Sequence, residues 1–297
     1  MAKSFLLLHC QTISVKSGIV ISGGFNGEDL TSVEVISTTR NNPLQLPSLP
    51  MTISGSPSIF QYNDSIMLCG GWNNLEHCLR LERGKWIHFN TLNQGRTFAS
   101  VATTATSTFI FGGSRSPKTY EFLSKNAKVW ELGKKRIPGG LLRGSAITIS
   151  QDEIWIIGGM YTGRRILCFN TQTHSFKELR TKLLQERYGH QCAFIPGKSQ
   201  RLIITGGYSG GSLNSTEILN VESGIVTQAA SMNCKRAYHG IGVLKVDNMD
   251  KIAVFGGWDG TEHPRKVEVY NAEEQSWELV DIELRLPRVD FGFLSQS

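Results

Sequence analysis

The chain lacks the long apolar runs and the charge density that mark several classes of protein. No stretch approaches the roughly eighteen apolar residues of a membrane span. An apolar segment at residues 5–8 follows Lys3, but it is too short for a signal peptide. Charged residues make up 19% and hydrophobic residues 40% of the 297 residues, which is typical of a globular rather than a disordered chain. We therefore expect a cytoplasmic protein without membrane contact.

The sequence also lacks the spacings of common metal and redox sites. None of the six cysteines forms Cys-x-x-Cys, and we interpret them as buried free thiols in a reducing compartment rather than as a disulfide frame. They are Cys10, Cys69, Cys78, Cys168, Cys192 and Cys234. No two histidines lie at a metal-ligand spacing on one predicted element. We therefore expect no metal, no cofactor and no enzyme activity.

The chain instead has a repeated double glycine. Each pair follows a short run that is apolar on both faces, which predicts a strand covered on both sides. Two glycines at a strand end cost about 1 kcal/mol each, so we expect them at a crowded hub where backbones approach closely. Spacings of 42 to 50 residues indicate a repeat array. The pairs are Gly23-Gly24, Gly70-Gly71, Gly112-Gly113, Gly158-Gly159, Gly206-Gly207 and Gly256-Gly257.

Three further features recur around the glycines and predict four strands per unit. An arginine opens a first strand 15 to 20 residues before the glycines, which end the second strand. A glutamate lies in an alternating third strand, and a large residue follows in a fourth, which indicates antiparallel strands joined by turns. The arginines are Arg96, Arg143, Arg187 and Arg236, and the glutamates are Glu34, Glu121, Glu217 and Glu268.

With these features the chain resembles the kelch-repeat family. The resemblance rests on the six glycine pairs, on Val-Glu-Val at 33–35 and 267–269, on Trp86, Trp130 and Trp277, and on the Arg-x-x-His segments at 187–190 and 236–239. It implies an all-β fold, a six-bladed kelch β-propeller with four antiparallel strands per blade, formed as a single domain by residues 1–297.

A propeller must close, because an open blade leaves an exposed edge. Residues 288–294 match the opening of a first strand better than residues 4–11 do. We therefore expect a strand near 288–295 to complete blade 1 beside residues 17–24.

The predicted topology places a set of arginines and aromatic residues on one face of the disc. The first two strands of a blade are antiparallel, so the start of the first and the end of the second lie at the same edge. Arginine beside aromatic residues is typical of binding hot spots. The predicted partner-binding residues are Arg96, Arg115, Arg143, Arg187, Arg236, Arg288, Phe25, Trp72, Tyr161, Tyr208 and Trp258. Because arginine recurs, some copies could instead pair with the blade glutamates; Arg115 breaks the repeat.

The resemblance implies a protein-interaction module. Kelch domains of ubiquitin-ligase substrate adaptors bind acidic peptides or loops on this face, and actin-associated kelch proteins act as scaffolds. A net charge of +6 suits an acidic partner. The dimerising and ligase-binding domains of such adaptors are absent from these residues. Charge reversal of Arg143, Arg187 and Arg236 is expected to abolish binding and leave the fold intact.

Two alternatives follow from other residues. Trp72, Tyr161, Tyr208 and Trp258 could stack on sugar rings, which predicts a carbohydrate-binding propeller. Nucleic-acid binding would rest on the basic isoelectric point and on the run at 134–136. We interpret that run as a solvated loop and expect no nucleic-acid partner.

Overall fold

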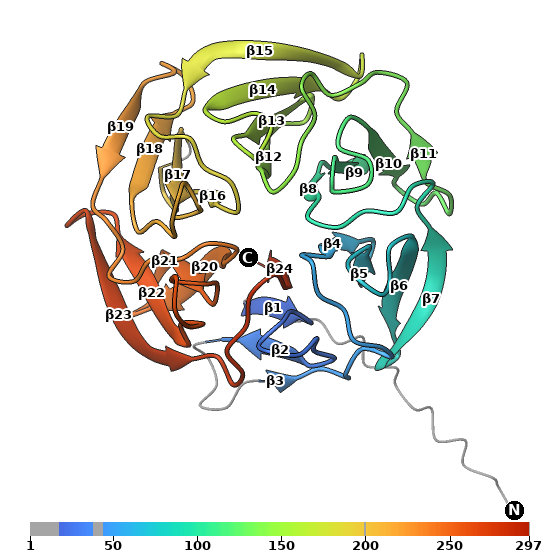
Figure 1. Cartoon of the computed structure of the whole chain (residues 1–297), viewed down its shortest axis with the longest axis horizontal. Helices are drawn as coiled ribbons and strands as arrows, with labels where there is room; N and C mark the ends of the chain where they lie inside the picture. The colour runs from blue at the N-terminus through green and yellow to red at the C-terminus, as the bar shows by residue number, and fades with distance from the viewer. Residues whose placement is uncertain (1–17, 38–43, 199, 297) are drawn as a thin grey trace, which may run out of the picture.

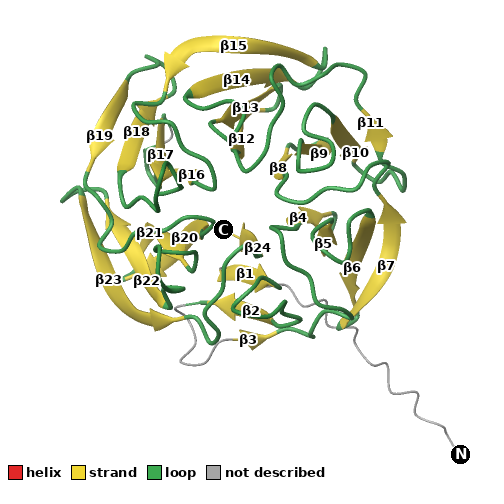
Figure 2. Ribbon diagram, in the orientation of Figure 1, coloured by secondary structure: helices red, strands yellow, loops and turns green. Residues whose placement is uncertain are grey.

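The chain forms six four-stranded antiparallel sheets arranged as blades around a centre (Figure 1). A computed structural model describes residues 18–37, 44–198 and 200–296. All its regular elements in these residues are strands (Figure 2). The prediction of an all-β, six-bladed propeller with four antiparallel strands per blade is confirmed. No helix in the described part of the chain is long and apolar enough to cross a membrane.

The blades are numbered in chain order, and their strands are given from the centre outward. Blade 1 consists of β24 (Gly292–Gln296), β1 (Gly18–Ser22), β2 (Val33–Ile36) and β3 (Leu44–Gln45). Blade 2 consists of β4 (Ser58–Tyr62), β5 (Ser65–Cys69), β6 (His77–Glu82) and β7 (Lys85–Thr91). Blade 3 consists of β8 (Ser100–Thr103), β9 (Ser107–Phe111), β10 (Tyr120–Ser124) and β11 (Glu131–Leu132).

The second half of the disc repeats this order. Blade 4 consists of β12 (Ser145–Ser150), β13 (Glu153–Ile157), β14 (Arg165–Asn170) and β15 (Ser175–Lys182). Blade 5 consists of β16 (Gln191–Phe194), β17 (Arg201–Thr205), β18 (Thr216–Asn220) and β19 (Val226–Ala229). Blade 6 consists of β20 (Gly240–Val246), β21 (Met249–Phe255), β22 (Lys266–Asn271) and β23 (Ser276–Glu283).

Blade 1 combines segments from distant parts of the sequence. β24 pairs antiparallel with β1, and Val20 lies opposite Leu294 in the register. The strand nearest the centre of blade 1 therefore comes from residues 292–296. Residues 4–11, the other segment considered for this strand, lie outside the described residues.

The core is a ring of apolar clusters, each between two neighbouring blades. Ile53 and Leu68 belong to the cluster between blades 1 and 2, and Val254 and Trp277 belong to the one between blades 5 and 6. The second strand of each blade contacts both neighbours, which explains why β1 is buried along its whole length. The continuous apolar runs of the sequence thus mark strands that lie between two interfaces.

The glycine pairs join each blade to the next. The Gly113 N–H donates a 3.0 Å hydrogen bond to the Leu141 carbonyl of the following link, and the Gly207 N–H does the same to Arg236 at 2.8 Å. Gly112 has a φ of +67°, and a Cβ there would lie 2.2 Å from the Leu141 carbonyl oxygen. Glycine is required both for the left-handed backbone and for the close approach.

Gly112→Ala should therefore lower the free energy of unfolding by about 1–3 kcal/mol, because the backbone conformation and the carbonyl contact are both strained. Urea denaturation followed by tryptophan fluorescence measures the change. Gly210→Ala is the matched control, since Gly210 has a φ of +71° but nothing within 4 Å of its Cβ position. Equal losses in the two variants would show that the carbonyl contact contributes nothing.

Candidate partner-binding face

The loops after the glycine pairs and the links into the first strands share one face of the disc, here called the glycine face. Four of the predicted site residues lie in the links on this face, but each is at most 1% exposed. They are Arg96, Arg187, Arg236 and Arg288. Each forms an ion pair within its own blade, and the acidic partners are Glu121, Glu217, Glu268 and Glu34. The sequence-based prediction that these four arginines contact a partner is therefore wrong.

Each buried pair ties three backbone segments together. In blade 6, Arg236 donates to the carbonyl of Gly256 at 3.0 Å and to Glu268 at 3.0 Å. Glu268 accepts hydrogen bonds from the N–H groups of Asn233 and Cys234 in the link that precedes Arg236. Burial of a charge is tolerated when it is paired and hydrogen-bonded in this way. Burial lowers the pKa of three of the arginines, and the paired glutamate opposes that shift; they are Arg96, Arg187 and Arg288.

Blades 2 and 4 replace both members of the ion pair by apolar residues. In blade 4, Leu141 and Leu167 take the two positions and pack in one cluster. Ile53 and Leu79 do so in blade 2. The arginine and the glutamate are therefore present together or absent together. Arg143 lies two residues beyond the arginine position of the other blades, so the sequence-based alignment of Arg143 with the buried arginines is also wrong.

Arg143 instead belongs to a ring of residues at the centre of the glycine face, here called the central ring. One residue per blade contributes, and all six have φ between +48° and +62°. They are Ser56, Phe98, Arg143, Gly189, Tyr238 and Asp290. Their backbones are linked from blade to blade; for example, the Arg143 N–H donates to the Phe98 carbonyl at 3.1 Å, and the Gly189 N–H donates to the Arg143 carbonyl at 2.6 Å.

The Arg143 guanidinium lies between aromatic rings and reaches across the central ring. Its Cζ atom is 3.7 Å from the Phe98 ring centroid and 4.1 Å from that of Tyr238. It pairs with Asp290 of blade 1, on the opposite side of the ring, at 3.2 Å. Burial holds the pKa of Asp290 above its ordinary value, although the ion pair with Arg143 opposes the shift. Both side chains remain 19% exposed, so a partner carboxylate could compete with Asp290 for Arg143.

A cavity of about 510 Å³ lies along the first strands of the six blades. Tyr238 and Ser56 of the central ring line it together with small polar and apolar side chains, among them Ser100, Ser145 and Ile241. Within the described residues, no three His, Cys, Asp or Glu side chains gather closely enough to hold a metal ion.

The predicted aromatic residues differ in how far they project from the glycine face. Phe25 and Trp72 are 40% exposed, and Tyr161 is 51% exposed beside the equally exposed Met160. Tyr208 is half-buried against Tyr188. Trp258 is half-buried and packs against His263 with ring centroids 5.0 Å apart. These loops therefore present separate apolar contacts around the central ring.

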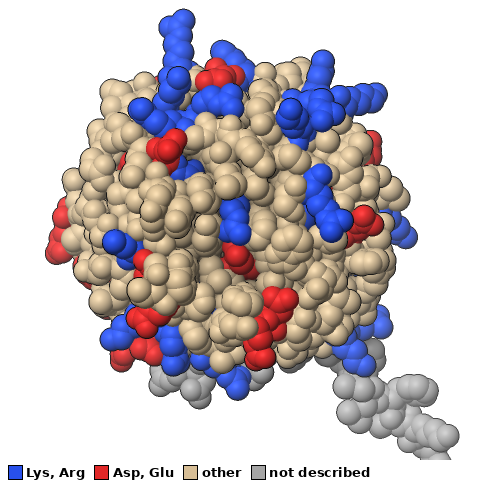
Figure 3. Space-filling view, in the orientation of Figure 1, with Lys and Arg blue, Asp and Glu red and all other residues tan. Residues whose placement is uncertain are grey.

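Arg115 projects from the β9–β10 loop, where other blades have polar or aromatic residues. Arg115 and the nearby Lys118 are exposed, and neither side chain has a hydrogen bond or ion pair with another described residue. The face in Figure 3 carries Lys and Arg side chains over its upper part and along its margin. Arg115 therefore stays a predicted partner-binding residue. Lys118, which the sequence analysis did not single out, is exposed in the same loop.

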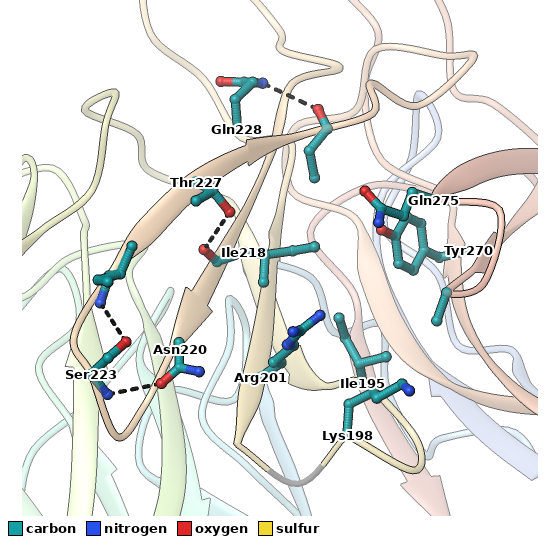
Figure 4. Close-up of a pocket in the computed structure, with 13 residues that line it drawn as sticks. Ile195, Lys198, Arg201, Ile218, Asn220, Ser223, Thr227, Gln228, Tyr270 and Gln275 are labelled. Atoms are coloured by element: carbon teal, nitrogen blue, oxygen red, sulfur yellow. Dashed lines mark hydrogen bonds between the residues drawn. The ribbon is translucent and has the colours of Figure 1, made fainter.

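The opposite face carries a groove of about 330 Å³ between blades 5 and 6 (Figure 4). Ile195 and Ile218 line it together with Tyr270, and Lys198 and Arg201 enter it from the β16–β17 hairpin. On its far side, the Ser223 N–H donates to Asn220 at 2.8 Å. Lys198 and Arg201 are exposed, so they provide a charge-matched comparison for Arg115 and Lys118.

The expectation of six free thiols is wrong for one pair. Cys69 and Cys78 are directly opposite in the β5–β6 register and form a disulfide. Cys168, Cys192 and Cys234 are free, whereas Cys10 lies outside the described residues. Burial raises the pKa of Cys192 to about 12, so this thiol is protonated at neutral pH.

Residues 207–211 match Gly-x-Ser-x-Gly by letter. A nucleophile elbow of this pattern joins a strand to a helix. Here the next element is β18, and the Ser209 N–H donates to the Gly211 carbonyl within the turn. The motif therefore forms part of a hairpin loop and receives no catalytic assignment.

Comparison with known proteins points to one repeat family. The Kelch motif model matches residues 250–281, which cover all of β22 and most of β21 and β23. A RING finger domain and kelch repeat-containing protein of Dictyostelium discoideum is 26% identical over 185 residues. The match covers 62% of this chain and 18% of the relative, so this chain corresponds to less than a fifth of the relative's length.

Proposed function

We propose that this chain, a six-bladed β-propeller that matches the Kelch motif over residues 250–281, is a protein-interaction module whose glycine face binds an acidic peptide or loop. Kelch repeats generally mediate protein–protein interactions. The observation that carries the proposal is the exposed set of Arg115, Lys118 and Tyr161 on the glycine face, which also carries Arg143 in its central ring, since arginine and aromatic side chains dominate binding hot spots.

The site is smaller than the arginine set expected from the sequence. Four of the predicted arginines are buried and form ion pairs inside their blades. Arg115 is exposed, and Arg143 is half-buried. Arg143 is held by two aromatic rings, so little side-chain entropy is lost when it pairs with a partner carboxylate. A carboxylate that displaces Asp290 would gain a preorganised arginine, and burial, which raises the pKa of Asp290, disfavours the charged form of the carboxylate that is displaced.

The role we propose is that of a substrate receptor or scaffold rather than an enzyme. The Dictyostelium relative carries kelch repeats and a RING finger domain in one protein, and a ubiquitin-ligase-like assembly is one setting for such a receptor. The proposal includes a cytoplasmic location, which imaging of the tagged full-length protein tests.

Arg115→Glu/Lys118→Glu should weaken the binding of acidic peptides by at least about tenfold, because two attractive charges become repulsive. Peptides are first selected on the wild-type protein from a random display library, and their affinities are then measured by fluorescence anisotropy. The proposal requires the selected peptides to be rich in Asp and Glu.

Lys198→Glu/Arg201→Glu is the control, because it makes the same charge change on the opposite face and should leave the affinity unchanged. Thermal denaturation verifies that both variants are folded. Equal losses in the two variants would indicate a non-specific effect of net charge, and a library without acidic enrichment would overturn the proposal. A glycan array screened in parallel tests the carbohydrate-binding alternative.

A further inference from the structure

The Arg143–Asp290 pair at the centre of the glycine face is held more loosely than the four ion pairs inside the blades. The blade pairs have nitrogen–oxygen distances of 2.6–3.0 Å, and their side chains are at most 7% exposed. Each blade glutamate also accepts a hydrogen bond from at least one backbone N–H group. Asp290, at 3.2 Å from Arg143, accepts only from Arg143 and from the Ser56 hydroxyl among the described residues. Its carboxylate is therefore easier to displace than that of a blade glutamate.

The Arg143 guanidinium is a preformed site for a planar anion. Its two terminal nitrogens donate to different oxygens of Asp290, at 3.2 and 3.5 Å, which is the fork arrangement by which arginine recognises carboxylates. The rings of Phe98 and Tyr238 hold the guanidinium in place. Gly189 is needed for this arrangement, because a Cβ there would lie 2.2 Å from the Tyr238 ring. The glycine of the central ring thus leaves the space that Tyr238 needs to reach Arg143.

Aromatic rings continue from this site in two directions across the glycine face. On the Phe98 side, Trp72 packs edge-on with ring centroids 5.9 Å apart. On the Tyr238 side, the ring of Tyr188 follows at 6.3 Å, and that of Tyr208 lies 5.4 Å beyond it. Aromatic side chains supply large apolar contact areas. A segment whose carboxylate binds at the centre would therefore find apolar surface on both sides of that carboxylate.

We infer that the central ring is a binding site for a side-chain carboxylate of the partner, and that Asp290 occupies this site in the free protein. The inference rests on the proposed function and adds how its affinity is set. The bound segment carries an Asp or Glu with apolar residues on both sides. Asp290 must turn away before the partner pairs with Arg143, so the apparent affinity is reduced to the fraction of molecules in which the site is open.

The exchange of carboxylates needs only a rotation of the Asp290 side chain. Val289 and Phe291, on either side of Asp290, are buried. Val289 also exchanges two backbone hydrogen bonds of 2.9 Å with Phe25, so the backbone that carries Asp290 is fixed. Burial in the central ring disfavours the charged carboxylate. Rotation into water therefore restores solvation, which offsets part of the ion pair that Asp290 loses.

Asp290→Asn should strengthen the binding of library-selected acidic peptides by about tenfold, because the internal competitor loses its charge while the Arg143 fork stays in place. Arg143→Met should weaken the same peptides by about tenfold or more, and Asp290→Asn should give no gain in the Arg143→Met background. Fluorescence anisotropy measures these affinities with peptides that are amidated at the C-terminus, so that only side-chain carboxylates are tested. Asp290→Ser is a second variant, since Ser56 has the equivalent position in blade 2.

Glu262→Gln is the matched control, because it removes one negative charge from an exposed loop of the same face. It should change the affinity much less than Asp290→Asn does. Equal gains in the two variants would indicate a general effect of net charge and would overturn the internal occupant. Replacement of each peptide Asp or Glu by Asn or Gln should identify one position at which the gain from Asp290→Asn disappears.

The outcomes separate this inference from the proposed function. If Arg115→Glu/Lys118→Glu weakens the peptides while both Asp290 variants leave the affinity unchanged, the internal occupant is overturned and acidic-peptide binding stands. If the library yields no acidic peptides, both proposals are overturned. Thermal denaturation shows whether the variants are folded. Unfolding of both Asp290→Asn and Asp290→Ser would show that the pair holds the fold together, and this result would also overturn the inference.

Discussion

Glu268→Ala should lower the free energy of unfolding by about 3–5 kcal/mol, because removing one partner of a buried ion pair leaves an unpaired charge in the interior. Arg236 would keep its hydrogen bond to the Gly256 carbonyl but lose its anion, and the N–H groups of Asn233 and Cys234 would lose their acceptor. Chemical denaturation with fluorescence detection measures the loss. Glu273→Ala, in an exposed turn, should change stability by less than about 0.5 kcal/mol.

The apolar pairs of blades 2 and 4 supply a second variant for this prediction. Arg236→Leu/Glu268→Leu reproduces the arrangement of Leu141 and Leu167, and it should recover most of the stability that Glu268→Ala loses. Replacement of a buried ion pair by apolar residues is often neutral or stabilising. If the double variant is as unstable as Glu268→Ala, the loss does not arise from the unpaired charge. Reversal of Arg187 or Arg236 should likewise unfold its blade, contrary to the expectation of an intact fold.

The second large effect is a loss of stability in mild acid, caused by buried histidines. His190 is fully buried, and burial, with a further contribution from the Arg187 charge, lowers its pKa to about 3. Burial lowers the pKa of His239 as well. In the unfolded chain both return to about 6.5. Their contribution to stability is therefore complete above pH 6.5 and is lost as the pH falls toward 3.

Between about pH 7.5 and pH 5, each such histidine should cost about 2 kcal/mol of unfolding free energy, because the unfolded state binds a proton that the folded state does not. Urea denaturation at the two pH values measures the difference. His190→Gln should reduce the pH dependence, and the exposed His77→Gln should leave it unchanged. An unaltered slope in His190→Gln would show that this histidine is not the group that titrates.

The fold was predictable because its main signals are local and repeated. A strand that ends at Gly206-Gly207 needs a left-handed backbone and room for the Arg236 carbonyl, and glycine alone meets both conditions. Six such sites at similar spacing leave few architectures other than a propeller. The exposed aromatic residues were also predictable, since Phe25 and Trp72 follow the glycines directly, Tyr161 comes one residue later, and the loop topology places them on one face.

The roles of the arginines depend on side-chain direction, which the repeat does not encode. Arg96 and Arg143 open neighbouring blades in similar sequence contexts, yet a two-residue offset places one inside its blade and the other in the central ring. The joint loss of arginine and glutamate in blades 2 and 4 was the signal that could have separated them. Cys69 and Cys78 were missed for a related reason, because their pairing depends on the hairpin register.

Closure of blade 1 has a consequence for biosynthesis. β1 ends at Ser22 and its inner neighbour β24 begins at Gly292, so 270 residues of synthesis separate two strands that must pair. At a translation rate of about 5–20 residues per second, that interval lasts about 15–50 s. During this time β24, the strand that pairs with the inner edge of β1 in the described residues, is missing from the nascent chain. Ribosome-bound chains that end before residue 292 should therefore bind chaperones. Chaperone binding should stop once β24 has left the ribosome and can pair with β1.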